Sequence, residues 1–141
     1  MKSIGKGKSG SIEDYDIKNF RKEIDVNLIG AFICVKTFGK VMAERTEGSI
    51  INIASDAGLV APDQSIYHPQ ENINRLKHFK PASYSISKHG LIGMTKYIAT
   101  YWGHKKVRCN ALAFGAVKKD QSKYINLSKP FKNSFNYIFS R

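Results

Sequence analysis

The sequence predicts an α/β domain built on a parallel β-sheet. Three observations indicate this class: a long helical pattern precedes a short β-branched strand, a second helical pattern follows, and a second strand comes after it. A helix that links two strands of one sheet makes a right-handed crossover, which leaves the strands parallel. The chain has 141 residues, 42% of them hydrophobic, and fits one domain of this class.

The first helix is predicted from about residue 17 to residue 45, with Asp16 as its N-cap. Gly48 ends this region. The apolar residues recur at three- and four-residue steps and form one stripe along the helix, made by Phe20, Ile24, Leu28, Ala31, Phe32, Val35, Phe38 and Met42.

The remaining elements follow in order. Residues 49–54 are short and rich in β-branched residues, as a buried parallel strand is. Residues 55–81 hold three prolines and break all regularity, and a loop of this length is more often functional than idle. Residues 82–103 are predicted as a helix that closes at Gly103, and residues 107–113 as the second strand.

The two ends of the chain carry much of its formal net charge of +12. Residues 1–10 hold three lysines and no acid, while residues 118–141 hold five lysines and one arginine against one aspartate. We expect residues 1–12 to be a flexible basic lead-in, and we leave the basic tail, 118–141, unassigned. Nucleic-acid binding would rest on charge alone, without a recognisable reading motif, and is not expected.

Composition also bears on the compartment of the protein. The sequence has no run of 18 apolar residues, so no membrane span is predicted, and no secretory signal is recognised at its start. Cys34 and Cys109 lie in apolar segments, where a buried free thiol is the usual state. These features favour a reducing, cytoplasmic location.

Two kinds of binding site are not expected. Residues 5–10, GKGKSG, invite comparison with a phosphate-binding P-loop, but that motif needs glycine where Lys2 stands, and no strand precedes it. The four histidines are dispersed, without a partner ligand at metal-binding spacing, so no metal site is predicted.

Tyr84 and Lys88 are the strongest candidates for chemistry. They are four residues apart in a predicted helix, so they lie on one face about one turn apart. A nearby ammonium favours the phenolate and lowers a tyrosine pKa from about 10 toward neutrality. Such a tyrosine can act as general acid in carbonyl reduction or as general base in alcohol oxidation.

Three further segments are predicted to converge on the same place. Ser55 follows the first strand, at the sheet edge where ligands collect, and its hydroxyl can donate to an oxygen that gains negative charge. Asn27 is a polar amide beside the apolar stripe and needs a specific partner. The second strand ends at residues 114–117, from which backbone could reach a ligand.

Four segments of the sequence, DVNLIGAF, GSIINIAS, YSISK-x-GLIGMT and VRCNALAFG, resemble consecutive blocks of the short-chain dehydrogenase/reductase family, in the family's order. The resemblance covers about residues 13–117 and identifies them as the C-terminal catalytic half of a Rossmann-like domain. The first four strands of the doubly wound parallel sheet would be absent.

The resemblance implies a role for each candidate residue. Tyr84 would transfer the proton, and Lys88 would hold the nicotinamide ribose and tune Tyr84. Ser55 would polarise the substrate carbonyl, and Asn27 would orient a water linked to the lysine. Gly115 and Val117 match the segment that borders the nicotinamide, so the resemblance implies that they bind the cofactor together with Tyr84 and Lys88.

The implied activity is NAD- or NADP-dependent interconversion of a carbonyl and an alcohol. The loop GLVAPDQSIY and the run YWGHKKVRCNAL resemble family members of sugar metabolism, which suggests a small sugar-related substrate. The long helices resemble those of the family's dimer interface, so a homo-oligomer is expected.

The sequence departs from the family at its start, at Phe114 and in its tail. The Gly-rich nucleotide loop should precede residue 13, and Phe114 stands where the family has proline. Two hypotheses therefore remain open. The chain is either an oxidoreductase represented by an incomplete chain that is inactive alone, or a non-catalytic remnant that acts as a dimerisation or interaction module.

Overall fold

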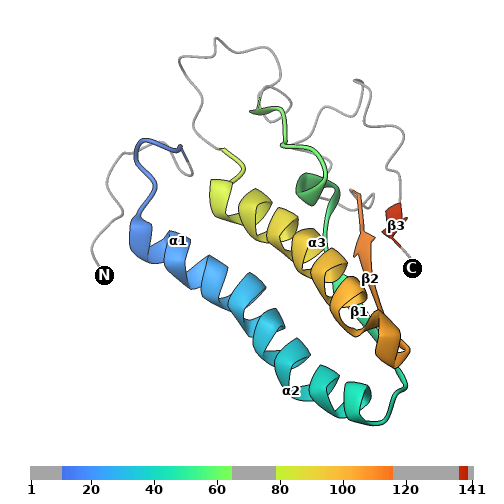
Figure 1. The fold of residues 1–141 in the computed structure, drawn as a ribbon. Helices are drawn as coiled ribbons and strands as arrows, with labels where there is room; N and C mark the ends of the chain where they lie inside the picture. Colours follow the sequence, from blue (N-terminus) through green and yellow to red (C-terminus); the bar gives the residue numbers. More distant parts are fainter. Residues whose placement is uncertain (1–10, 65–78, 116–136, 140–141) are drawn as a thin grey trace.

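A long helix opens the fold. In the computed structural model, which describes residues 11–64, 79–115 and 137–139, this helix comprises α1 (Ile17–Ile24), a π-helical turn (Asp25–Ile29) and α2 (Gly30–Glu44). Asp16 caps it as predicted, because its carboxylate accepts a hydrogen bond of 3.0 Å from the Lys18 N–H. Figure 1 shows the three parts as one continuous rod.

The strands confirm the predicted parallel pair. β1 (Gly48–Ile53) and β2 (Val107–Ala113) run parallel, and α3 (Ala82–Trp102) makes the crossover between them. A third strand, β3 (Tyr137–Phe139), pairs antiparallel with β2, so the strand order is β1-β2-β3. β3 lies in the basic tail, residues 118–141, for which the sequence pattern predicts no element.

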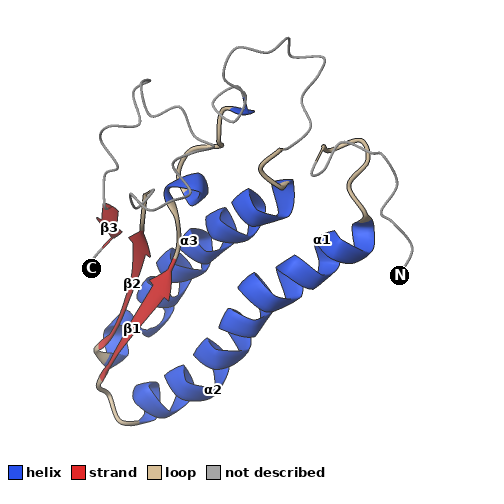
Figure 2. Ribbon diagram, turned by 180° about the vertical axis from the view of Figure 1, so that it is seen from behind, coloured by secondary structure: helices blue, strands red, loops and turns tan. Residues whose placement is uncertain are grey.

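The core lies between the sheet and the helices, all of which cover the same side of the sheet in Figure 2. One buried cluster joins Ala54, Ile92, Ala111 and Ala113, and a second joins Val35, Ile98 and Cys109. Asn52 adds a buried polar link from β1 to α3, since its amide donates to the Thr95 hydroxyl at 2.8 Å. The fold is therefore a partial Rossmann-like α/β arrangement with α3 at its centre.

β1 leaves one edge and one face of this sheet open. It pairs with β2 on one side only, and the structure describes no strand on its other side. Ile51 and Ile53 are 57% and 53% exposed on the face that turns away from the helices. Parallel sheets are normally covered on both faces, so this open side is an unusual apolar surface.

The open side explains two corrections to the sequence predictions. Cys34 is exposed rather than buried, and only Cys109 is a buried free thiol. In the predicted apolar stripe, Val35 is buried, but Phe32 and Phe38 are 48% and 62% exposed. β1 and β2 contact only part of the stripe, so its other residues stay exposed.

The helix of residues 17–44 also bears on the prediction that no segment spans a membrane. By length and composition alone it could cross a bilayer, with a mean hydropathy of 1.5 over an 18-residue window. Core helices of soluble proteins pass the same test. Here the helix packs along α3 and β1, and that contact accounts for part of its apolar character.

Candidate active site

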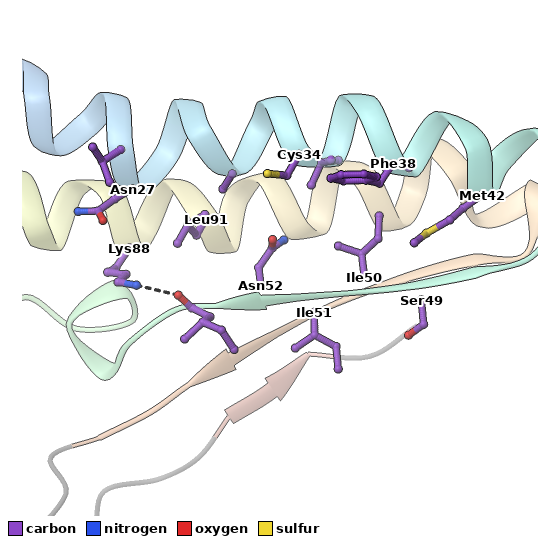
Figure 3. Close-up of a pocket in the computed structure, with 15 residues that line it drawn as sticks. Asn27, Cys34, Phe38, Met42, Ser49, Ile50, Ile51, Asn52, Lys88 and Leu91 are labelled. Atoms are coloured by element: carbon purple, nitrogen blue, oxygen red, sulfur yellow. Dashed lines mark hydrogen bonds between the residues drawn. The ribbon is translucent and has the colours of Figure 1, made fainter.

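Asn27 lies in the π-helical turn of the long helix. The Gly30 N–H bonds to the Asp25 carbonyl, five residues back, so the helix takes in one extra residue at this point. Such π-bulges occur frequently at functional sites. Asn27 borders two cavities of about 520 and 510 Å³ and shares the first with Lys88 (Figure 3).

Ser55 lies where predicted, directly after β1, and it is buried. Its hydroxyl accepts a hydrogen bond from the Ala57 N–H at 3.2 Å and donates one to the Asp56 carboxylate at 2.8 Å. The single hydroxyl proton is thus already engaged. To donate to a substrate oxygen, the Ser55 hydroxyl has to turn away from Asp56, a requirement that no sequence pattern predicts.

Tyr84 and Lys88 lie one turn apart on α3, as predicted. The Lys88 ammonium donates to the Ile53 carbonyl at 2.7 Å, shown as the dashed line in Figure 3, and lies 5.7 Å from the centre of the Tyr84 ring. Lys88 therefore connects α3 to the carboxyl end of β1, the edge where ligands of open α/β sheets bind.

Two contacts press the segment after β1 against α3. The Ser85 hydroxyl donates to the Ala57 carbonyl at 2.6 Å. A Cβ added to Gly58 would come within 2.7 Å of the Lys88 backbone, so only glycine allows this approach. These contacts bring the Ser55 segment and the Tyr84–Lys88 turn to the same end of the sheet.

The end of β2 reaches the same edge. The Asp56 N–H bonds to the Phe114 carbonyl at 3.0 Å, which fixes the backbone just before Gly115. The Phe114 side chain is 45% exposed and does not line either cavity. Val117, the other predicted cofactor contact, lies outside the described residues.

Sequence reasoning missed Lys80. Its ammonium lies 4.3 Å from the centre of the Tyr84 ring, closer than Lys88. Its position depends on the path of the chain before α3, and no periodic pattern in the sequence predicts that path. The one available signal was its place four residues before Tyr84, with Pro81 between them at the start of a helix.

A hydrogen-bonded cluster beside Tyr84 was also missed. The Tyr15 hydroxyl donates to the Glu23 carboxylate at 3.0 Å and lies 2.8 Å from the buried Ser83 hydroxyl, which bonds to Glu23 as well. Burial raises the pKa of Tyr15; Glu23 adds to the rise, while the Ser83 hydrogen bond opposes it.

The residues present suit one end of a nicotinamide dinucleotide. The Lys88 ammonium and the Tyr84 hydroxyl are donors of the kind that ribose hydroxyls take, and they lie at the ligand-binding edge of the sheet. The pyrophosphate end is different, because in Rossmann folds it binds at the N-terminus of a helix that opens directly from a glycine-rich loop.

Residues 5–10 also fit the spacing G-x-G-x-x-G of such a loop, with Gly5, Gly7 and Gly10 at the three glycine positions. They lie outside the described residues, but the helix that follows them begins only at Ile17. The Asp16 carboxylate occupies its N-terminus. The N-terminus of this helix is therefore not free to bind a phosphate. Among the described residues, no group of three or more His, Cys, Asp or Glu side chains could hold a metal ion.

A two-strand parallel crossover with these groups at its carboxyl edge is part of a doubly wound, Rossmann-like fold. Family models described as "short chain dehydrogenase" and "Enoyl-(Acyl carrier protein) reductase" match residues 2–68 and 74–137. The chain belongs to the short-chain dehydrogenase/reductase family.

Relatives and solved structures agree with this assignment. The chain is 33% identical over 111 residues to a 3-oxoacyl-[acyl-carrier-protein] reductase from Synechocystis, and 29% identical over 113 residues to a D-threitol dehydrogenase from Mycolicibacterium smegmatis. These matches cover 78% and 80% of the chain, but 38% and 37% of the relatives.

A similar structure is that of a putative NAD(P)-dependent gluconate 5-dehydrogenase from Beutenbergia cavernae with bound NADP. It matches with a TM-score of 0.63 at 27% identity, over 78% of this chain and 38% of that one. The chain thus spans little more than a third of the length of the proteins that it matches.

Proposed function

We propose that this chain is the catalytic half of an NAD- or NADP-dependent oxidoreductase that interconverts a small carbonyl compound and its alcohol. We also propose that the chain alone is inactive. The observation that carries the proposal is the convergence of Tyr84, Lys88 and Ser55 at one end of the sheet. The names of the relatives support an alcohol or carbonyl substrate, and D-threitol suggests a sugar-related one.

Each residue has a distinct task in this proposal. Tyr84 moves the proton to or from the substrate oxygen, and Ser55, once released from Asp56, donates a hydrogen bond to that oxygen. Lys88 and Tyr84 would hold the nicotinamide ribose, with Gly115 and Val117 bordering the ring, and Asn27 would orient a water that connects to Lys88. The nicotinamide, when bound, supplies or accepts the hydride.

Binding of the dinucleotide tests the first part of this proposal. NADH and NADPH titrated into the chain, followed by fluorescence or calorimetry, should show no micromolar affinity, because a pyrophosphate site is not formed by the described residues. The chain joined to the part of the Synechocystis relative that it does not span should bind. Micromolar binding by the chain alone would overturn the proposed inactivity.

One observation favours a second function, that of an interaction module. The open edge of β1 and the 520 Å³ cavity beside it form a groove between α2 and β1, with Phe38 along it (Figure 3). Unpaired strand edges recruit other chains. A homo-oligomer, as the family resemblance implies, or a complex with an intact relative would cover this groove.

Light scattering of the purified chain tests this alternative. A defined oligomer that becomes monomeric in Phe38→Lys, and persists in Thr37→Lys on the neighbouring exposed position, would support it. A soluble monomer or a heterogeneous aggregate would contradict it.

We also propose a cytoplasmic location, which the free thiols of Cys34 and Cys109 support.

A further inference from the structure

Lys80 occupies a fixed position beside the proposed catalytic tyrosine. Its backbone N–H donates to the Gln64 side-chain oxygen at 2.9 Å, and its carbonyl accepts from the Gln64 side-chain nitrogen at 3.3 Å. Both polar groups of the Lys80 backbone are thus held by one amide. Pro81 follows as the N-cap of α3, with its φ restricted by the ring. The start of the lysine side chain is therefore held on both sides.

The other end of the side chain lies over Tyr84. Its ammonium is 4.3 Å from the ring centre, within the range of a cation–π contact. Lys88 lies 5.7 Å from the same centre, so two positive charges flank the group that is proposed to move the proton. The Lys88 ammonium already donates a hydrogen bond to the Ile53 carbonyl.

The carboxylates of the site are engaged elsewhere. Glu23 accepts hydrogen bonds from Tyr15 and Ser83, and Asp56 accepts from Ser55 and from the Ala57 N–H. Within the part of the chain that the structure describes, no carboxylate forms an ion pair with Lys80. A cation–π contact with a partly exposed ring is worth only about 0.5–1 kcal/mol, less than a charged hydrogen bond, so a ligand oxyanion can compete for the ammonium.

We propose that Lys80 determines substrate specificity by binding an oxyanion group, a phosphate or a carboxylate, of a substrate whose reacting oxygen lies at Tyr84 and Ser55. This inference rests on the proposed function and adds the substrate class to it. A substrate oxygen bonded to Tyr84 places its neighbouring substituents near the ring, which is where Lys80 lies. An ammonium is a point charge that binds either a phosphate or a carboxylate, so both kinds of oxyanion fit.

The groups involved all belong to this chain, so the full 141-residue protein serves for the test. Sorbitol 6-phosphate, gluconate, sorbitol and inorganic phosphate are titrated separately, and NMR follows the backbone amides of Ser55 and Tyr84. We expect sorbitol 6-phosphate or gluconate to shift both amides with a Kd at least about 10-fold below that of sorbitol, the size of one ion-pair contribution near 1.4 kcal/mol. The stronger of the two identifies the oxyanion.

Three variants test whether Lys80 causes this preference for an anionic ligand over sorbitol. Lys80→Gln should reduce it to less than about 3-fold, Lys80→Arg should restore it because the charge remains, and Lys36→Gln, at an exposed position on α2, should leave it unchanged. The circular dichroism spectrum of each variant confirms that it is folded.

Three results would overturn the inference: a preference that survives Lys80→Gln, sorbitol binding as tight as that of its anionic analogues, or inorganic phosphate reproducing the shifts of both amides. In the second case sorbitol still shifts Ser55 and Tyr84, so the proposed function stands and only the role of Lys80 fails. If no polyol shifts these amides, the proposed substrate site fails together with the inference.

Discussion

At the scale of single residues, the site depends on a glycine as much as on its reactive groups. Gly58 lets the segment after β1 approach the Lys88 backbone, and this approach keeps Ser55 and Lys88 at the same end of the sheet. The sequence identified both polar residues because each sits in a block with a recognisable pattern. Gly58 lies in no recognisable sequence pattern, because its importance comes from a contact with a residue thirty positions away.

Substitution of Gly58 tests this contact. In Gly58→Ala the added methyl group would overlap the Lys88 backbone, which cannot swing aside as a flexible side chain can. We expect a loss of about 1–3 kcal/mol in the free energy of unfolding, measured by urea denaturation.

Gly93→Ala is the matched control. Gly93 lies in α3 with nothing within 4 Å of an added Cβ, so alanine should stabilise the helix by about 0.5–1 kcal/mol. Equal effects of the two substitutions would contradict the close contact between Gly58 and α3.

At the scale of elements, the period of the apolar residues predicted the helices and strands to within a residue or two. It could not predict the π-helical turn at Asp25–Ile29, because one extra residue in a long helix barely disturbs a pattern of three- and four-residue steps. That turn contains Asn27. β3 was missed for a different reason: three residues in a basic tail are too few to show alternation.

The sequence predicted where α3 starts, but it did not predict the contacts that hold the first turn of this helix. Pro81 provides no side-chain cap, and Ser83 in the first turn instead bonds to Glu23 of α1. Tyr15 adds a third member from the segment before α1. This cluster joins the two helices that carry Asn27 and Tyr84.

Removing its carboxylate tests this connection. Glu23→Leu removes the acceptor that the Tyr15 and Ser83 hydroxyls share, so only one of the two can still donate, to the other, and the change should cost about 1–3 kcal/mol in urea denaturation. Glu44→Leu, which breaks the exposed pair with Lys40, should cost less than about 1 kcal/mol. A Glu23 variant as stable as Glu44→Leu would show that the cluster contributes little.

The same cluster has a pH dependence. The pKa of Tyr15 is raised in the folded state, chiefly by burial, so the folded protein holds this proton more tightly than the unfolded chain. Its contribution is complete below the unfolded pKa of about 10 and is lost as the pH rises through the higher folded value. In Tyr15→Phe this alkaline decline in stability should be weaker.

At the scale of the whole molecule, the chain combines the proposed proton-transfer site with an open sheet. The Rossmann-like class and the family followed from the sequence, because four blocks occur in a fixed order and each block forms one element of the fold. The positions of Lys80 and Tyr15 did not follow, since segments without sequence periodicity bring Lys80 to Tyr84 and Tyr15 to Ser83. The exposure of Phe38 did not follow either, because an apolar stripe does not say how much sheet covers it.

We propose that Tyr84 is the group that transfers the proton in carbonyl reduction. The most direct test is the rate of NAD(P)H-dependent carbonyl reduction by the chain joined to the part of the Synechocystis relative that it does not span. Tyr84→Phe should lower this rate at least about 100-fold, the usual contribution of a positioned general acid. Tyr97→Phe, which removes an exposed hydroxyl from the same helix, should leave the rate unchanged. A Tyr84→Phe protein that reduces its substrate as fast as Tyr97→Phe would show that Tyr84 is not the proton-transfer group.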